Sequence, residues 1–221
     1  MDTIIQILAR ELGRSEAHVE NVVRLIDEGN TIPFIARYRK ELHGAMDDTA
    51  LRTLADRLQY LRNLDKRREE VKSAIEGQGK LTEELSAAID AAATLAEVED
   101  LYRPYKQKRR TRATVAREKG LEPLAELLFA QAADGPAPEE AAGAFIDPEK
   151  GVETAEDALQ GASDIIAERI SDDADIRKRL RELVWKKGYL VSAAAAKEPE
   201  DTVYRLYYAF RSPLNRVQGH Q

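Results

Sequence analysis

The sequence contains no cysteine, which excludes disulfide bonds, thiolate nucleophiles and cysteine-ligated metal sites. Aromatic residues make up only 6% of the chain. No apolar run approaches the roughly 18 residues that a membrane-spanning helix needs. The chain opens with Met1-Asp2 and not with a basic, apolar leader. We therefore expect a cytoplasmic protein that makes no membrane contact.

The length and composition favour a helical fold. The 221 residues are enough for one or two domains with a real core. Charged residues make up 33% of the chain, and its apolar share leans on alanine more than on β-branched or aromatic types. That mixture is typical of helices. We predict an all-α fold, an irregular multihelical array with at most one short sheet.

One long helix is predicted to be the spine of this array. Asp47 or Asp48 caps it, and it runs to about Ile75. Its apolar stripe consists of Leu51, Leu54, Leu58, Leu61, Leu64, Val71 and Ile75. Successive steps of three residues are too short for a 3.6-residue turn, so the stripe winds around the helix. We expect its two halves to pack on different neighbours.

Two segments are candidates for a helix-turn-helix, Val19–Tyr38 and Thr114–Leu128. Helix pairs of this kind are common in any helical array, and the pattern does not choose between them. The clearest turn in the chain is Gly135-Pro136-Ala137-Pro138, which makes 134–138 a candidate seam between subdomains.

The C-terminal third is acidic at first and richer in aromatic residues at its end. Thirteen acids and two bases lie between Asp134 and Asp175. Tyr189–Ser192 suits a short strand, and Pro199 is predicted to open a last helix. The apolar residues of that helix repeat at helical spacing: Val203, Leu206, Tyr207 and Phe210. We predict that Trp185 lies in the core.

No pattern in the sequence indicates an active site, a metal site or a cofactor. The three histidines, His18, His43 and His220, are far apart, and none stands at ligand spacing with a carboxylate. The run Gly79–Thr82 lacks the first glycine and the preceding strand of a phosphate loop. We therefore expect a protein that is not an enzyme and binds no cofactor.

The strongest charge feature is residues 103–119, called here the basic segment. It carries one acid, Glu118, and eight bases: Arg103, Lys106, Lys108, Arg109, Arg110, Arg112, Arg117 and Lys119. Its net charge is +7 in a chain of net −6, so the remainder is net −13. A cluster of positive charge on an acidic molecule is expected to bind a negatively charged group. That group belongs to nucleic acid, to a partner protein or to the chain's own acids.

Two hypotheses for the basic segment stay open at this point. In the first, an exposed loop binds phosphates through Lys106, Lys108, Arg109, Arg110 and Arg112, while Tyr102 and Tyr105 stack on bases. In the second, the same cations dock onto residues 134–175 or onto protein outside this chain. A smaller cluster, Arg37, Arg39 and Lys40, has the same two interpretations besides that of a solvated helix face.

Several stretches together resemble one known family. They are Ile32–Glu41, Gln78–Leu81, Leu101–Lys106, Lys108–Thr114 and Ala116–Leu124. In these stretches the chain resembles the N-terminal helical region of the bacterial transcription accessory proteins of the Tex family. The likeness covers nearly the whole chain, and no common motif shares these stretches.

The resemblance implies a cytoplasmic, multidomain, nucleic-acid-binding protein. Its family adds a resolvase-like nuclease-fold domain, helix-hairpin-helix elements and an S1 RNA-binding domain to a helical N-terminal region. The chain stops at Gln221, before the resolvase-like part, so we expect a fragment of a longer protein.

We expect the fragment itself to be a non-enzymatic scaffold that binds nucleic acid only weakly. The alternative is a protein–protein interaction module. The expected partners are RNA or DNA, the missing C-terminal domains and the transcription machinery.

Overall fold

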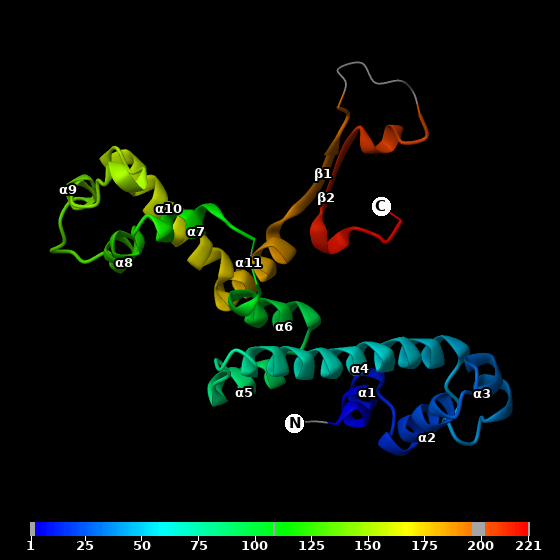
Figure 1. Cartoon of the computed structure of the whole chain (residues 1–221). Helices are drawn as coiled ribbons and strands as arrows, with labels where there is room; N and C mark the ends of the chain where they lie inside the picture. The colour runs from blue at the N-terminus through cyan, green and yellow to red at the C-terminus, as the bar shows by residue number, and fades with distance from the viewer. Residues whose placement is uncertain (1–2, 108, 196–201, 221) are drawn as a thin grey trace. The chain divides into compact units, whose positions relative to one another are not determined.

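The computed structural model describes residues 3–107, 109–195 and 202–220. The chain divides into two units, Met1–Tyr102 and Arg103–Gln221, and each is described by itself (Figure 1). Eleven α-helices and a single two-stranded sheet lie within the described ranges. The predicted, mainly helical array is confirmed. None of the described helices combines the length and the apolarity needed to cross a lipid bilayer.

The first unit is built around α4 (Asp48–Glu76), the predicted spine. The five other helices of the unit pack against it. They are α1 (Ile4–Leu12), α2 (Glu16–Asp27), α3 (Ile32–Tyr38), α5 (Glu83–Ala91) and α6 (Leu95–Tyr102). The Asp47 carboxylate caps α4 by accepting a 2.7 Å hydrogen bond from the backbone N–H of Ala50.

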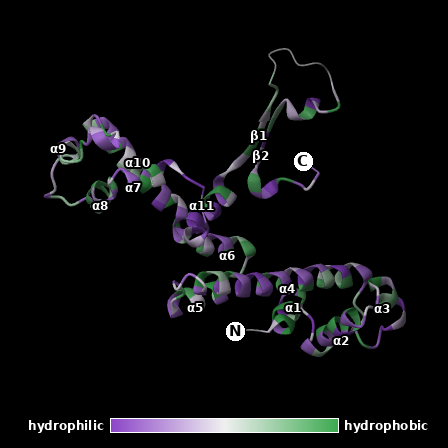
Figure 2. Ribbon diagram, viewed as in Figure 1, coloured by the Kyte–Doolittle hydropathy of each residue, from purple (hydrophilic) through white to green (hydrophobic). Residues whose placement is uncertain are grey.

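All seven apolar side chains predicted for the stripe of α4 are buried. Hydrophobic and hydrophilic residues alternate along this helix in Figure 2, as expected for a helix that packs on only part of its circumference. Each fully buried leucine contributes about 1.5–3 kcal/mol relative to an exposed one, so this stripe is a major contribution to the core of the unit.

Four cations of α4, spaced five residues apart, each form an ion pair with a different helix. Arg57 bonds to Glu11 of α1, Arg62 to Asp27 of α2, Arg67 to Glu99 of α6 and Lys72 to Asp90 of α5, at 2.6–2.9 Å. Five residues advance about 140° around a helix, so the cations reach different sides of α4. Each such pair near the surface contributes about 0–1 kcal/mol.

The second unit is organised around α10 (Ala155–Asp172). It packs against α7 (Arg112–Glu118), α8 (Glu122–Ala130) and α9 (Pro138–Gly143). Gly161 permits the close approach of α10 and α7, because a Cβ there would collide with Cδ1 of Leu121 and lie 3.3 Å from Cβ of Ala116. The loop with Gly135 connects α8 and α9 inside this unit, and the predicted seam at 134–138 stays a prediction.

The unit ends in α11 (Ala174–Lys187) and a β-hairpin of β1 (Tyr189–Ala193) and β2 (Ala209–Pro213). The strands are antiparallel, with Tyr189 opposite Pro213 and Val191 opposite Arg211. Short 3₁₀ turns complete the unit: η1 (Arg103–Tyr105), η2 (Pro148–Lys150), η3 (Arg205–Tyr207) and η4 (Leu214–Arg216).

Two predictions for this end of the chain are wrong. The predicted last helix is replaced by η3 and β2, and Pro199, its predicted first residue, lies outside the described residues. Of the four residues at helical spacing only Phe210 lies in β2, where it pairs with Ser192 of β1, and this tertiary pairing overrides the helical spacing. Trp185 is 57% exposed and not in the core, because no residue of α11 is buried.

Candidate nucleic-acid interface at the basic segment

The basic segment is only partly a loop. Arg103 lies in η1, residues 106–111 connect η1 to α7, and Arg112 begins α7. Thr111 caps α7, because its Oγ1 accepts a 3.1 Å hydrogen bond from the backbone N–H of Thr114. This cap defines the start of α7. Because Arg112 and Arg117 are part of that helix, its geometry fixes the directions in which their side chains leave the backbone.

Three acids of α10 face these cations at intervals of four residues. Residues four apart lie on one side of a helix, so Asp164, Glu168 and Asp172 form a row. Their side chains are only 13–16% exposed. The contacts are Arg112 Nη2 to Asp164 at 3.5 Å, Arg117 Nη1 to Glu168 at 2.7 Å and Arg103 Nε to Asp172 at 2.8 Å. These three cations of the basic segment are thus paired within the unit, with Arg103 and Arg117 on its inner side and Arg112 on its outer side.

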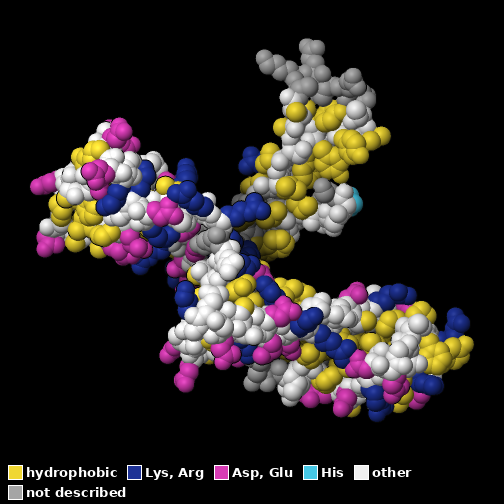
Figure 3. Space-filling view, in the orientation of Figure 1, with side chains coloured by type: hydrophobic (Ala, Val, Ile, Leu, Met, Phe, Trp, Pro, Cys, Tyr) yellow, Lys and Arg dark blue, Asp and Glu magenta, His cyan; other side chains and the backbone are white. Residues whose placement is uncertain are grey.

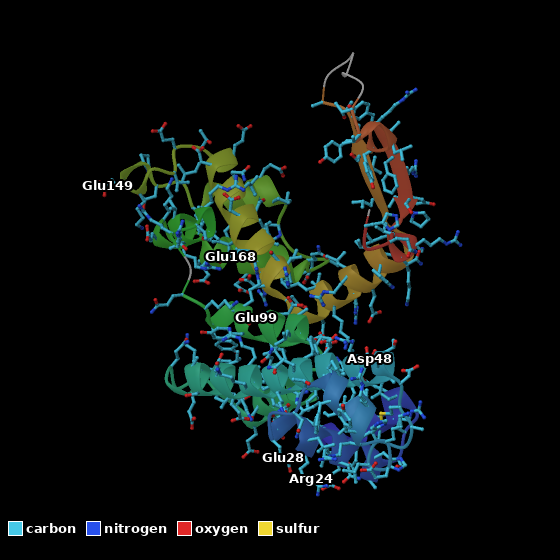
Figure 4. All side chains as sticks on the ribbon, turned by 90° about the vertical axis from the view of Figure 1, so that its right-hand side faces the viewer. Arg24, Glu28, Asp48, Glu99, Glu149 and Glu168 are labelled. Carbon is cyan, nitrogen blue, oxygen red and sulfur yellow. The ribbon has the colours of Figure 1, made fainter. Side chains whose placement is uncertain are left out.

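Glu168 is the centre of this row (Figure 4). Its Oε2 accepts from Arg117 and its Oε1 accepts a 3.0 Å hydrogen bond from the Thr111 hydroxyl. The hydrogen bond from Arg117 to Glu168 raises the pKa of Arg117, and the charge of Glu122 adds to the effect. Glu168 of α10 therefore bonds both to Thr111, the N-cap of α7, and to Arg117 in the last turn of α7.

The predicted phosphate-binding residues differ in their surroundings. Arg109 is exposed, and Arg110 is exposed but bonds to Glu118 at 2.6 Å. Arg112 reaches Asp164 while its side chain stays 85% exposed. Lys106 is exposed and has an interaction partner of its own, and Lys108 lies outside the described residues. The outer side of the segment still presents positive charge to solvent.

An open groove of about 430 Å³ lies between α7 and α10. Arg110, Arg112, Lys119, Asp157 and Asp164 supply its charges. Lys119 donates a 2.6 Å hydrogen bond to the carbonyl of Gly151. The carboxylate of Asp157 accepts from the backbone N–H groups of Glu153 and Thr154, and its bonding to Thr154 lowers its pKa. The charged groups of the groove are therefore engaged in holding the fold.

Among the residues that the structure describes, no group of three His, Asp or Glu side chains is placed to hold a metal ion.

The second predicted cluster lies at the end of α3, in the first unit. Arg37 and Lys40 are exposed. The guanidinium of Arg39 lies 5.2 Å from the centre of the Phe34 ring and donates a 3.1 Å hydrogen bond to the carbonyl of Tyr38. This cluster and the basic segment belong to different units, and each is assessed separately.

Both helix-turn-helix candidates contain two consecutive helices. In the first, α2 and α3 contact each other, and in the second, Lys119, Gly120 and Leu121 separate α7 from α8. A recognition helix is defined by its contacts with DNA. The assignment of a helix-turn-helix therefore stays a prediction.

A further basic surface, on α11, was missed in the sequence. The helix carries two acids, Asp175 and Glu182, and six bases, Arg177, Lys178, Arg179, Arg181, Lys186 and Lys187. The charge run is visible in the sequence, but the leucines within it indicated a packed helix. Its exposure is evident only from the structure.

Comparison with known proteins shows which families and relatives this sequence resembles. Residues 2–76 match the family described as Tex-like protein N-terminal domain, and residues 134–221 match the one described as Tex central region-like. The chain is 47% identical to Protein tex of Bordetella pertussis and 41% identical to transcriptional accessory protein Tex of Neisseria gonorrhoeae. It is 30% identical to human S1 RNA-binding domain-containing protein 1.

Each of these alignments covers 99% of the chain but only 22–28% of the relative. The chain thus spans less than a third of the length of these proteins. The first match lies within the first unit and the second match lies within the second unit. The chain therefore matches the N-terminal and central regions of Tex-like proteins.

Proposed function

We propose that this chain is a non-enzymatic helical scaffold of a Tex-like transcription accessory protein that binds RNA or DNA at full length. The relatives' names support transcription and RNA binding, since one is named for its S1 RNA-binding domain. The proposal places the protein in the cytoplasm, in contact with nucleic acid, with its remaining domains and with the transcription machinery.

The observation that carries the scaffold role is the pairing of the basic segment with α10. Each acid of the row at 164, 168 and 172 already has a cation of the same unit. Charge-assisted bonds to largely buried carboxylates are stronger than exposed pairs. The geometry therefore favours internal docking over phosphate binding for the inner cations, Arg103 and Arg117.

The outer cations are tested by changing Arg109, Arg110 and Arg112 to alanine together. Single-stranded RNA is titrated at two salt concentrations, and thermal unfolding is recorded. Docking predicts lowered thermal stability with unchanged affinity, because Arg112 loses Asp164 and Arg110 loses Glu118. Lost affinity with intact stability would instead assign the outer side to nucleic acid.

The absence of catalysis is tested separately on the purified chain. We expect no magnesium-dependent cleavage of nucleic acid and no nucleotide hydrolysis, since Asp157 and Asp164 are occupied with a helix cap and an ion pair. Activity that co-purifies with the protein and disappears in Asp157→Asn or Asp164→Asn would overturn this part.

A protein–protein interaction module is the second candidate function. One face of α11 favours it, because Leu180, Leu183 and Val184 are 48–53% exposed on that face. Contiguous exposed apolar residues mark interaction sites. In this case the partner is another protein surface and not nucleic acid.

A further inference from the structure

The C-terminal end of α3 carries three cations and two aromatic rings. The ring centres of Phe34 and Tyr38 lie 5.2 Å apart. The guanidinium of Arg39 lies 5.2 Å from the centre of the Phe34 ring. The guanidinium of Arg37 lies 6.0 Å from the centre of the Tyr38 ring, and Lys40 follows in the chain and is exposed. These five residues are called here the α3 cluster.

The cations of the α3 cluster differ from those of the neighbouring helix α4. Arg57, Arg62 and Arg67 of α4 each bond to a carboxylate of another helix. Among the described residues, none of the three cations of the α3 cluster forms such a pair. Three bases and one acid, Glu41, lie between Ile32 and Met46, so the net charge of this stretch is +2. Figure 3 shows Lys and Arg side chains beside hydrophobic ones at the end of the first unit where Figure 1 places α3.

The stability of α3 accounts for only part of this arrangement. The helix dipole favours cations near the C-terminal end of a helix, and Arg39 also donates a hydrogen bond to the carbonyl of Tyr38. These effects explain the cations but not the ring of Tyr38, which is 56% exposed. A cation–π contact reaches to about 6 Å, so Arg37 is at the limit of that range. Its guanidinium therefore stays available to a ligand.

The α3 cluster lies on a well-anchored part of the first unit. Ile35 of α3 is fully buried. The turn after α3 is held against α2, because the side-chain amide of Asn21 donates a 3.2 Å hydrogen bond to the carbonyl of Leu42. In the same turn the ring of His18 packs so closely on Gly44 that a Cβ there would collide with it. A ligand therefore meets a backbone that is already ordered, which lowers the entropic cost of binding.

The combination of positive charge and an exposed ring indicates the class of ligand. Proteins that bind single strands combine cations for the phosphates with aromatic rings on which unpaired bases stack. Lys40 is two residues from Tyr38, so their backbones are at most about 7 Å apart and both side chains reach one strand. A duplex offers no free base face to Tyr38, whereas a single strand does. An acidic protein would pair with the cations but does not require the ring.

We propose that the α3 cluster is a contact site for single-stranded nucleic acid. Phosphates contact Arg37 and Lys40, and a base stacks on the ring of Tyr38, against which Phe34 packs. This inference rests on the proposed nucleic-acid function and assigns it a surface in the first unit, distinct from the basic segment.

Labelled oligouridine of about 12 nucleotides, titrated into the whole chain over a series of salt concentrations, tests the role of the cations. Arg37→Ala with Lys40→Ala removes two phosphate contacts and makes the log–log salt slope shallower by about 1.4. Arg14→Ala with Lys80→Ala is the matched control, because Arg14 and Lys80 are exposed cations of the same unit. The control should leave the slope unchanged. An equal change of slope in the two double variants would overturn the proposal, since net charge alone would then explain binding.

Two substitutions of Tyr38 test stacking. Tyr38→Ala weakens the binding of oligouridine about tenfold, because one stacked base is lost. Tyr38→Phe keeps an aromatic ring and retains the affinity. Equal losses in the two variants would overturn the stacking of a base at this site. Circular dichroism and thermal unfolding verify that each variant is folded.

Failure of this inference is distinguishable from failure of the proposed function. Oligouridine binding that none of these variants weakens would overturn the inference and leave nucleic-acid binding at another surface. The absence of any binding by the chain would also overturn it. Titration of the full-length protein with the same oligouridine then tests the proposed function by itself.

Labelled polyglutamate is the probe for an acidic protein partner. It offers carboxylates without bases that stack, so we expect weaker binding that Tyr38→Ala does not change. Polyglutamate binding as tight as that of oligouridine would overturn the nucleic-acid assignment and indicate an acidic protein surface as the partner.

Discussion

In the basic segment, Arg103, Arg112 and Arg117 each meet an acid of α10, whereas on α11 six bases share the helix with two acids. Both stretches belong to the second unit and both are strongly basic in sequence. The first stretch packs against a helix that carries largely buried acids, whereas no residue of α11 is buried. A count of charges along the chain therefore identifies candidate surfaces, and the packing partner decides which of their cations are held against buried acids.

The same contrast holds for apolar residues. Leu121 and Leu124 are buried between α8 and α10, whereas Leu180 and Leu183 have similar spacing and are about half exposed. Helical periodicity indicates which residues share a face. It does not indicate whether that face meets protein or solvent.

The largest expected effect compares one leucine from each region. Leu124→Ala removes a fully buried side chain and should lower the free energy of unfolding by about 2–5 kcal/mol. Leu183→Ala, the same change at a half-exposed site, should lower it by about 0.5 kcal/mol or less. Urea denaturation measures both. Equal losses would mean that α11 is packed as tightly as α8 in solution.

The second prediction compares two glutamates. Glu168→Gln weakens the bonds to Arg117 and Thr111 and should lower the free energy of unfolding by about 1–2 kcal/mol. Glu182→Gln on α11 serves as the matched control and should change it by about 0.5 kcal/mol or less. The account fails here if Glu168→Gln is as neutral as its control in thermal and urea unfolding.

The smallest expected effect is a pH dependence in the first unit, where the same kind of pairing occurs on α4. Hydrogen bonds from Arg57 and Arg62 lower the pKa values of Glu11 and Asp27 in the folded state. The stability from these pairs is present above the ordinary carboxylate pKa of about 4 and is lost as the pH falls through the lowered values.

Because both pairs are near the surface, the total change is on the order of 1 kcal/mol. Replacing Arg57 and Arg62 with methionine should reduce the acid-induced fall in melting temperature between about pH 5 and pH 2. An unchanged fall would show that these two pairs do not contribute to acid stability.

The first unit was largely predictable because its determinants are local. The Asp47 cap and the apolar stripe of α4 lie within one element, so the sequence specifies both. The C-terminal hairpin was not predictable in this way. Its pairing joins Tyr189 to Pro213 across 24 residues, and the helical spacing from Val203 to Phe210 competes with it. The exposure of Trp185 likewise depends on which elements pack against α11.

The candidate site was also predictable only in its local features, and its contacts between distant residues were not. The sequence identified the basic segment and named the acidic region 134–175 as one possible partner, but it left phosphate binding open as the alternative. The contacts that distinguish the two hypotheses join Arg103 to Asp172 and Arg117 to Glu168, 51–69 residues apart. Only the folded unit reveals that this row of acids faces Arg103, Arg112 and Arg117.

The most direct test of the contrast between the two basic stretches is one pair of arginine variants, Arg117→Ala and Arg179→Ala. Thermal unfolding is measured for both. Arg117 bonds to the largely buried Glu168, whereas Arg179 is exposed on a helix that has no buried residue. The account predicts that Arg117→Ala lowers the melting temperature and that Arg179→Ala leaves it nearly unchanged. Equal losses in the two variants, or a larger loss in Arg179→Ala, would contradict it.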